Sequence, residues 1–321
     1  MIKKTLYFGN PTYLSLKNAQ LVIKLPEVEK TDTLPESFKA EAVRTIPIED
    51  IGVIVIDNKQ ITFTSGLMEA LLDNNCAVIT CDSRSMPQGL MLPLEGNTTQ
   101  RERFTAQIEA SQPLKKQLWQ QTIIAKIENQ ASVLNYVGAN LCVRPIEIRN
   151  MQKWAKEVKS GDSDNLEGRA AVYYWKNMFP EIEDFTRGRD GVPPNNLLNY
   201  GYAILRAVVA RALVTSGLLP TFGIHHRNRY NAFCLADDIM EPYRPFVDKL
   251  VVEIVDVETR HATSLPENLT KDIKAKLLQI PVLDVKINGQ RSPLMIAVGQ
   301  TTASLAKCYL GESRKIVYPS F

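Results

Sequence analysis

The residue pattern of the chain changes at one place, and this change restricts the folds that are open to it. Residues 1 to about 95 are short runs rich in Val, Ile, Thr and Tyr, bounded by Asn, Pro and Asp, as is typical of β-strands. From Thr99 onward, apolar residues such as Ile123, Ile127 and Leu134 recur at helical spacing. We therefore predict an α+β, multi-domain protein. A β-rich, sandwich-like domain at 1–95 and a linker at 96–99 should precede a larger all-α domain at 100–321 that carries the candidate site.

Several individual elements can be predicted inside these domains. The run IGVIVI at 51–56 is apolar on both faces, which indicates a strand buried between layers, and Ser65 should be the N-cap of the helix that follows. We expect no parallel sheet. In the second domain, Asn288-Gly289 predicts a hairpin, a last helix should run from about Leu294 to Tyr309, and the tail after it should be loose or bound to a partner.

Composition excludes some classes of protein and leaves others open. The chain has 321 residues, of which 45% are hydrophobic and 23% charged, and its net charge of +3 permits nucleic acid binding without arguing for it. Its five cysteines form no C-x-x-C pair, so neither disulfides nor a zinc site is predicted and a reducing cytoplasm fits best. The N-terminus lacks the apolar core of a signal peptide. Arg206 and Arg211 interrupt the most apolar stretch, so we expect no transmembrane helix.

Candidate chemistry is concentrated in the stretch GIHHRNRYNAFCLADDIMEPYRPFVD at 223–248. It holds His225 and His226, and it places Asp238 and Glu241 three residues apart, on one side of a helical turn. Carboxylates with one imidazole suit Mg²⁺ or Mn²⁺. Arginines beside such acids would hold an anion such as phosphate; they are Arg227, Arg229 and Arg244.

Simpler explanations exist for the same residues. Acids and arginines this close often form solvated surface pairs. Asp237 lies four residues before Glu241, so spacing allows it in place of Asp238. Cys234 with a histidine would be a nucleophile, but its apolar neighbours favour a small core residue.

Glu167 is a second candidate. It lies on the buried stripe of a helix predicted at 165–178 with Asn165 as its N-cap. A carboxylate in line with a packed face is unusual unless it is paired or binds a metal. Alternatively, the negative charge of Glu167 stabilises the positive N-terminal end of the helix. On spacing alone, this second explanation is the better one.

Basic residues form a third feature. A charge run on one helix is usually a solvated face, whereas in a nucleic-acid protein it would contact phosphates. The candidates on and before the helix predicted from about residue 145 are Arg144, Arg149, Lys153, Lys156 and Lys159, and those in the loop at 180–194 are Arg187 and Arg189.

Two motifs relate the chain to a known family. The first is G-x-x-H followed by L-x-x-D-x-M-E-P-x-R-P, which runs from Gly223 to Pro245, and the second is E-G-x-A-A from Glu167. On these motifs the chain resembles the CRISPR-associated endonuclease/integrase family, the large subunit of the complex that captures new spacers. It is most similar to the branch from type II systems, and the resemblance covers nearly the whole chain.

The resemblance implies a site and a reaction. Glu167, His226 and Glu241 would bind Mg²⁺ or Mn²⁺, and Asp238 would be a fourth ligand or support the others. The basic residues named above, with Arg227, Arg229 and Arg244, would bind DNA. The reaction would join the 3′-hydroxyl of a short DNA fragment to a phosphodiester of the CRISPR repeat, and with water as the nucleophile it would be endonucleolytic. Many members of the family have an aspartate at the position of Glu241, and both acids can bind a metal.

The resemblance also implies partners. These are DNA (the prespacer fragment and the CRISPR repeat), a second copy of the chain in a homodimer, a small dimeric adaptor subunit and the RNA-guided effector nuclease, with no membrane. Two other functions remain open: a catalytically silent DNA-binding scaffold subunit, and an unrelated metal hydrolase that acts on a small phosphomonoester.

Overall fold

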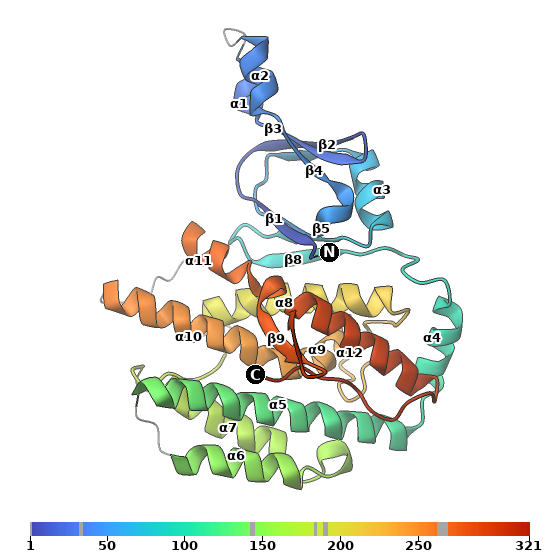
Figure 1. The fold of residues 1–321 in the computed structure, drawn as a ribbon, viewed down its shortest axis with the longest axis vertical. Coiled ribbons are helices and arrows are strands. Elements are labelled where there is room, and N and C mark those ends of the chain that lie inside the picture. The colour runs from blue at the N-terminus through green and yellow to red at the C-terminus, as the bar shows by residue number, and fades with distance from the viewer. Residues whose placement is uncertain (1, 32–34, 142–144, 183–184, 189–191, 262–268) are drawn as a thin grey trace. The chain divides into compact units, whose positions relative to one another are not determined.

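The computed structural model describes residues 2–31, 35–141, 145–182, 185–188, 192–261 and 269–321 (Figure 1). The chain splits into two compact units, Met1–Gly96 and Asn97–Phe321. Arg144 and Arg189, two of the predicted DNA-binding residues, lie outside the described residues.

The first unit is built on two four-stranded sheets. One has the order β1-β5-β7-β8 and the other the order β4-β3-β2-β6. The strands are β1 (Lys4–Phe8), β2 (Thr12–Lys17), β3 (Gln20–Lys24), β4 (Arg44–Pro47), β5 (Ile51–Ile56), β6 (Ile61–Phe63), β7 (Ala77–Cys81) and β8 (Pro87–Met91). The helical elements are α1 (Pro26–Glu29), α2 (Glu36–Ala42), the 3₁₀ turn η1 (Ile48–Asp50) and α3 (Ser65–Asp73).

One apolar core joins these elements. Leu14 of β2, Leu21 of β3, Ile54 of β5 and Leu67 of α3 belong to a single buried cluster, and none is more than 1% exposed. Elements of both sheets therefore bury a common core, as the alternation of apolar residues along strands allows.

Strand pairing corrects one expectation. Strand β5 pairs in parallel with β1 and β7, and β2 pairs in parallel with β6, so the prediction of no parallel sheet was wrong. The connection from β5 to β7 passes through β6 and α3, which is long enough for a parallel crossover. The continuous apolar run of β5, buried from Ile51 to Val55, is the pattern that such strands show. The N-cap of α3 is Thr64 rather than Ser65.

The second unit is mainly helical. Its helices are α4 (Gln100–Glu109), α5 (Gln112–Leu141), α6 (Pro145–Glu157), α7 (Leu166–Met178), α8 (Asn195–Thr215), α9 (Cys234–Met240), α10 (Arg244–His261), α11 (Lys271–Leu277) and α12 (Leu294–Tyr309). The 3₁₀ turns are η2 (Ser160–Asp162), η3 (Glu241–Tyr243) and η4 (Ile280–Val282). The predicted hairpin is confirmed as β9 (Asp284–Ile287) and β10 (Gln290–Pro293), with φ of 50° at Asn288 and 78° at Gly289.

Helix α5 is the element around which the candidate site is arranged. It contacts α6, α7, α10 and η3, and Figure 1 shows it running beside α6 and α7. Asn129 of α5 donates from Nδ2 to the carbonyl of Pro242, 2.8 Å away, and to that of Pro319, 3.0 Å away. Helix α5 therefore supports η3, the turn that begins with Glu241.

Helix α8 explains the most apolar segment. Among the described residues it is the one helix whose length and composition would allow it to cross a membrane, yet 72% of that apolar window is buried inside the structure. Leu198, Leu205 and Val209 are fully buried, as in a core helix.

The C-terminal tail was predicted to be loose or partner-bound, and the structure shows it packed instead. Ser320 exchanges two backbone hydrogen bonds with Lys286 of β9, at 3.0 and 2.7 Å. Ile316 is 3% exposed, and the ring of Phe321 stacks on Phe246 with centroids 4.1 Å apart. The prediction considered only the basic charge of the tail. Apolar residues lie beside its charged residues, and their burial holds the tail in place.

Candidate active site

A buried lysine joins two of the candidate acids. Nζ of Lys126, on α5, lies 2.7 Å from Oε1 of Glu167 and 2.6 Å from Oε2 of Glu241. The side chains of Lys126 and Glu241 are 10% and 8% exposed, and that of Glu167 is 25% exposed. Burial opposes the charge on Lys126, but Glu241 and Glu167 outweigh it and raise the pKa of the lysine. The two carboxylates are thus held close enough to share one cation.

Glu167 owes its position to the start of α7. Asn165, the predicted N-cap, adopts a left-handed conformation and accepts a hydrogen bond from the N–H of Gly168. The carboxylate of Asp162 accepts the N–H groups of Leu166 and Glu167, both at 2.9 Å. These caps satisfy the free N–H groups of the first turn, so the start of α7 and the backbone of Glu167 are fixed.

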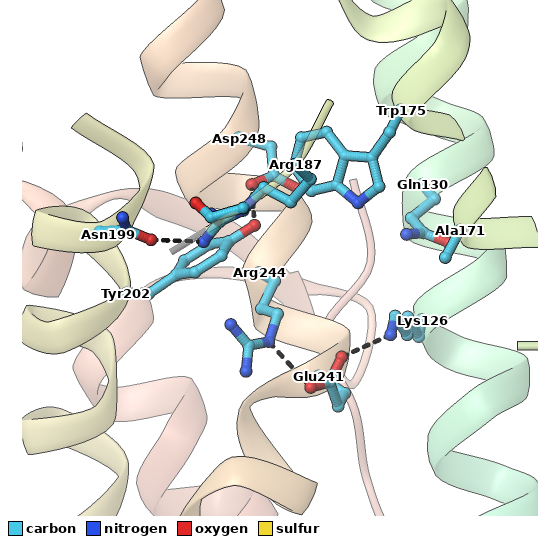
Figure 2. Close-up of a pocket in the computed structure, with 11 residues that line it drawn as sticks. Lys126, Gln130, Ala171, Trp175, Arg187, Asn199, Tyr202, Glu241, Arg244 and Asp248 are labelled. Atoms are coloured by element: carbon cyan, nitrogen blue, oxygen red, sulfur yellow. Dashed lines mark hydrogen bonds and ion pairs between the residues drawn. The ribbon is translucent and has the colours of Figure 1, made fainter. Parts of the chain in front are cut away.

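Glu241 is held from two sides. Its Oε1 accepts a hydrogen bond from Nε of Arg244 at 2.8 Å, and Figure 2 shows it between Arg244 and Lys126. Burial would raise its pKa, but Arg244 and Lys126 lower the pKa of Glu241 to about 2. Among the described residues its buried Oε2 has no hydrogen bond of normal geometry, although Lys126 Nζ is close to it. Glu241 is therefore a carboxylate kept ionised in a dry environment.

Asp238 orients His226. Its Oδ1 lies 2.5 Å from Nδ1 of His226, and its two oxygens also accept the backbone N–H groups of His225 and His226. Since an ionised carboxylate can only accept, Nδ1 donates, and in the neutral form of the imidazole Nε2 carries the lone pair. The hydrogen bond to Asp238, with further contributions from Glu241 and Glu167, raises the pKa of His226 despite its partial burial.

Gly223 allows this loop to close on α9. A Cβ built on Gly223 would lie 2.4 Å from the backbone oxygen of His226 and 2.8 Å from Oδ2 of Asp238. Only glycine fits such a close approach. The first residue of the G-x-x-H motif is therefore needed for the contact that the motif's histidine makes.

The neighbouring residues have other contacts. His225 stacks on Trp119 of α5, with ring centroids 4.3 Å apart, whereas His226 meets the same ring edge-on. Asp237 accepts from Nε of Arg206 and from Asn231, both at 2.7 Å. Cys234 is buried, and burial raises its pKa, which opposes a nucleophilic thiolate.

The candidate DNA-binding residues fall into two groups by exposure. The exposed residues on one face of α6 are Arg149, Lys153 and Lys156, and the exposed residues beside His226 are Arg227 and Arg229. Lys159 is exposed and paired with Asp164. Arg187 and Arg244 are instead partly buried, and both face a pocket beside Glu241.

That pocket was not predicted from the sequence. It has a volume of about 390 Å³, and its walls come from α5, α7, α8, η3, α10 and the loop residues Arg187 and Gly188 (Figure 2). Burial raises the pKa of Asp248 in its wall to about 7, although Tyr202 and Tyr174 donate hydrogen bonds to this carboxyl and Arg244 and Arg187 lie near it.

Lys126 was also overlooked in the sequence analysis. Its signal was available, since a lysine between Ile123 and Ile127 lies in line with an apolar stripe.

The side-chain chemistry of Glu167 and Glu241 suits a divalent cation. A cationic nitrogen already lies between Glu167 and Glu241, and a buried oxygen of Glu241 lacks a normal hydrogen bond. Two carboxylates and one imidazole are suitable ligands for Mg²⁺ or Mn²⁺. In the described part of the chain no three His, Cys, Asp or Glu residues are gathered tightly enough to hold a metal as they stand. Because Nζ of Lys126 already lies against both Glu167 and Glu241, a cation bound by these two carboxylates would have to displace it.

Comparison with known proteins identifies the family. Residues 6–274 match the family model of the CRISPR associated protein Cas1. The chain belongs to the Cas1 family. It is 35% identical over 304 residues to the CRISPR-associated endonuclease Cas1 of Neisseria meningitidis serogroup C (strain 8013), which covers 95% of this chain and 91% of that relative. This supports the resemblance to the type II branch of the Cas1 family.

Solved structures share the fold. A casposase bound to its integration product matches with a TM-score of 0.75 and 22% identity, over 98% of this chain and 92% of that one. A Cas1 protein from Thermotoga maritima matches with a TM-score of 0.70 and 17% identity, over 97% and 98%. A Cas6-RT-Cas1–Cas2 complex matches with a TM-score of 0.71 and 18% identity, over 99% of this chain and 36% of that one. At these identities the likeness concerns the fold.

Proposed function

We propose that this Cas1 family member is a metal-dependent DNA endonuclease and integrase. It would join the 3′-hydroxyl of a short DNA fragment to a phosphodiester of the CRISPR repeat by transesterification. The observation that carries the proposal is that Glu167 and the buried Glu241 lie around one cationic nitrogen, in the same unit as a histidine whose Nδ1 is bound to Asp238.

The residues can be given distinct tasks. Glu167, Glu241 and Nε2 of His226 would hold Mg²⁺ or Mn²⁺, which when bound would polarise the phosphodiester and stabilise the departing 3′-oxygen. Both oxygens of Asp238 accept hydrogen bonds from the histidine pair, and one of these bonds fixes the tautomer and ring orientation of His226, so we assign Asp238 the role of positioning the ligand. Arg244 uses Nε for Glu241, and in the described residues its terminal nitrogens donate to no group, which leaves them for a phosphate oxygen.

The proposed partners rest on the names of the similar proteins. The relative from Neisseria meningitidis is named an endonuclease, and two of the similar structures are named as Cas1–Cas2 complexes. We infer a homodimer that binds the prespacer fragment and the repeat and pairs with a small dimeric adaptor of the Cas2 kind. The RNA-guided effector nuclease is a further proposed partner, and the cytoplasm the proposed compartment.

A strand-transfer assay tests the function. Supercoiled DNA that carries a repeat would be incubated with a short donor, Mn²⁺ or Mg²⁺ and the protein, with and without the adaptor. Glu167→Gln and His226→Ala should abolish joining, because each removes one proposed ligand from a site with few ligands. His225→Ala should be milder, since its ring stacks on Trp119. Glu312→Gln, an exposed glutamate beyond α12, is the matched control.

The outcomes separate the alternatives. Joining by Glu167→Gln at the wild-type rate would contradict the proposal. An inactive His225→Ala beside an active His226→Ala would exchange the roles of the two histidines. A scaffold subunit would bind DNA without joining or cutting it, and a phosphomonoesterase would ignore DNA and act on small phosphate esters.

A further inference from the structure

Residues 314–321 of the C-terminal tail form a strap that runs along α5 (Figure 1). Gln121 of α5 donates from Nε2 to the carbonyl of Arg314, 2.9 Å away, and its Oε1 accepts the N–H of Ile316, also at 2.9 Å. Ile316 is buried, so apolar packing and hydrogen bonds hold the strap on the same helix. The strap therefore lies against the element around which the candidate site is arranged.

One buried amide ties the strap to the turn that carries Glu241. Nδ2 of Asn129, a residue that is 2% exposed, donates to the carbonyl of Pro242 at 2.8 Å and to that of Pro319 in the strap at 3.0 Å. Pro242 follows Glu241 directly, and both prolines are buried. Because the backbone groups of buried residues need a partner, this amide satisfies two of them at once and joins the turn to the strap.

Two further contacts connect the strap to the same region. Thr301 of α12 donates to the carbonyl of Val317 in the strap at 2.6 Å, so the hydroxyl of Tyr243, which is also 2.6 Å away, donates to Thr301 in turn. The ring of Phe321 stacks on that of Phe246, with centroids 4.1 Å apart. The segment that follows the acid of η3 is thus tied to the strap by three separate routes.

The strap also lies near Asp238. The hydroxyl of Tyr318 forms a hydrogen bond of 2.8 Å with Oγ1 of Thr122 on α5. Burial raises the pKa of Tyr318, and the charge of Asp238 raises it further. The same two causes raise the pKa of Tyr309 at the end of α12. Both phenols therefore lie within electrostatic reach of the carboxylate that holds His226.

We propose that the strap is a positioning element of the active site, and that Asn129 and Tyr318 are the positioning residues through which it acts. This rests on the proposed function, because it concerns the segment that would present Asp238 and Glu241 to a metal. Neither positioning residue would touch the metal or the DNA. The strap would keep the carboxylates of α9 and η3 in fixed places, as the outer groups around a metal site do for its ligands.

Hydrogen exchange in the presence of a chelator tests the positioning itself. Asn129→Leu removes both donated hydrogen bonds, so the amides of residues 234–247 should exchange roughly tenfold faster than in wild type. Asn135→Leu makes the same change at an exposed position of α5 and should exchange as wild type does. Wild-type exchange rates at 234–247 in Asn129→Leu would overturn the proposal.

Metal affinity shows whether the positioning matters to the site. Electron paramagnetic resonance of free Mn²⁺ measures binding without the reaction, and binding that Glu167→Gln abolishes belongs to the site. Asn129→Leu should bind this Mn²⁺ roughly 10- to 100-fold more weakly than wild type, and saturating Mn²⁺ should restore strand transfer because the ligands are still present. A merely structural role would lower the melting temperature and leave the Mn²⁺ affinity of the folded protein unchanged, which would contradict the proposal.

A milder pair of variants covers the case in which Asn129→Leu does not fold. Tyr318→Phe and Thr122→Val each remove one hydroxyl and keep the volume of the side chain. Each should weaken Mn²⁺ binding roughly 2- to 10-fold, and the double variant should lose little more than either one, since both remove the same hydrogen bond. Additive losses, or wild-type affinity in both single variants, would exclude Tyr318 as a positioning residue.

The outcomes keep this proposal apart from the proposed function. Faster exchange at 234–247 in Asn129→Leu, with no Mn²⁺ binding or joining by wild type, would contradict the proposed function and support the hold of the strap on this segment. Mn²⁺ binding and joining by wild type, with exchange and affinity unchanged in Asn129→Leu, would contradict the strap and leave the function in place.

Discussion

Oδ1 of Asp238 lies 2.5 Å from Nδ1 of His226, while both oxygens of the same carboxylate accept backbone N–H groups of the histidine pair. Asp238 is fully buried, so one side chain fixes both the loop and the imidazole ring. This arrangement is the one in which a ligating histidine is held by a carboxylate on its other ring nitrogen.

Asp238→Asn should therefore reduce strand transfer roughly 10- to 100-fold, because the amide cannot accept at both oxygen positions and the ring loses its fixed orientation. Asp237→Asn is the adjacent control. It loses a pair with Arg206, whose side chain is 44% exposed, so its effect on activity should be small. Rates measured across a Mn²⁺ titration check both variants. A greater loss from Asp237→Asn would assign the supporting role to Asp237.

Lys126 provides a second prediction, on metal affinity. Among the described residues, Lys126→Met leaves the buried Glu241 paired with Arg244 alone and Glu167 without a partner. This should lower the unfolding free energy by on the order of 3 kcal/mol. Mn²⁺ should restore much of this loss, since the ion would take the place of the ammonium. Scanning fluorimetry with and without Mn²⁺ should thus show a larger metal-induced rise in melting temperature for the variant than for wild type.

The control for this experiment is Lys307→Met, which changes an exposed lysine of α12 and should behave as wild type does. A metal-induced shift of Lys126→Met that is no larger than that of wild type would show that Lys126 and the metal do not compete for one position.

How much the sequence predicted depends on the range of the interaction. Local signals sufficed for α12, whose bounds of Leu294 and Tyr309 were predicted, and for the hairpin at Asn288-Gly289. The N-cap Asn165 was also predicted, because its effect lies within one helical turn. Parallel pairing of β5 was not, since it depends on which distant strands meet.

The candidate site shows the same division. Motif spacing placed Asp238 three residues before Glu241, but spacing could not say that Asp238 faces His226 while Asp237 faces Arg206. Lys126 was overlooked because its surroundings come from α7, η3 and α10, far along the chain. A lysine in a helix is usually solvated, so only tertiary structure identifies a buried one.

DNA affinity should depend steeply on salt. Contacts to about six phosphates would weaken binding roughly a thousandfold between about 50 and 200 mM salt. The exposed face of α6 supplies three of the proposed contacts, Arg149, Lys153 and Lys156, at helical spacing. Replacing all three by alanine should lower the slope of log affinity against log salt by roughly 3. Fluorescence anisotropy with a labelled duplex measures this, and Lys307→Ala is the control. An unchanged slope would exclude α6 from the interface.

Asp248 links the stability of the helical unit to pH. Burial raises its pKa to about 7, against about 3.9 in an unfolded chain. Between these values the folded state binds a proton that the unfolded state has released, so stability falls as pH rises from about 4 to 7. The pKa of Asp248 differs by about three between the folded and unfolded states, which corresponds to on the order of 4 kcal/mol of unfolding free energy. This contribution is fully present only below about pH 4.

Asp248→Asn should remove this dependence, because the amide carries no charge at any of these pH values while it still offers Tyr174 an acceptor. Chemical unfolding followed by the helical circular dichroism signal, at about pH 5 and about pH 8, measures the change. The unfolding free energy of the variant, relative to that of wild type, should be higher at about pH 8 than at about pH 5. Asp272→Asn, which changes an exposed aspartate of α11, should show no such difference. If wild type and Asp248→Asn lost stability in parallel between the two pH values, the proton would have to be bound elsewhere, and Asp248 would be ionised throughout this range.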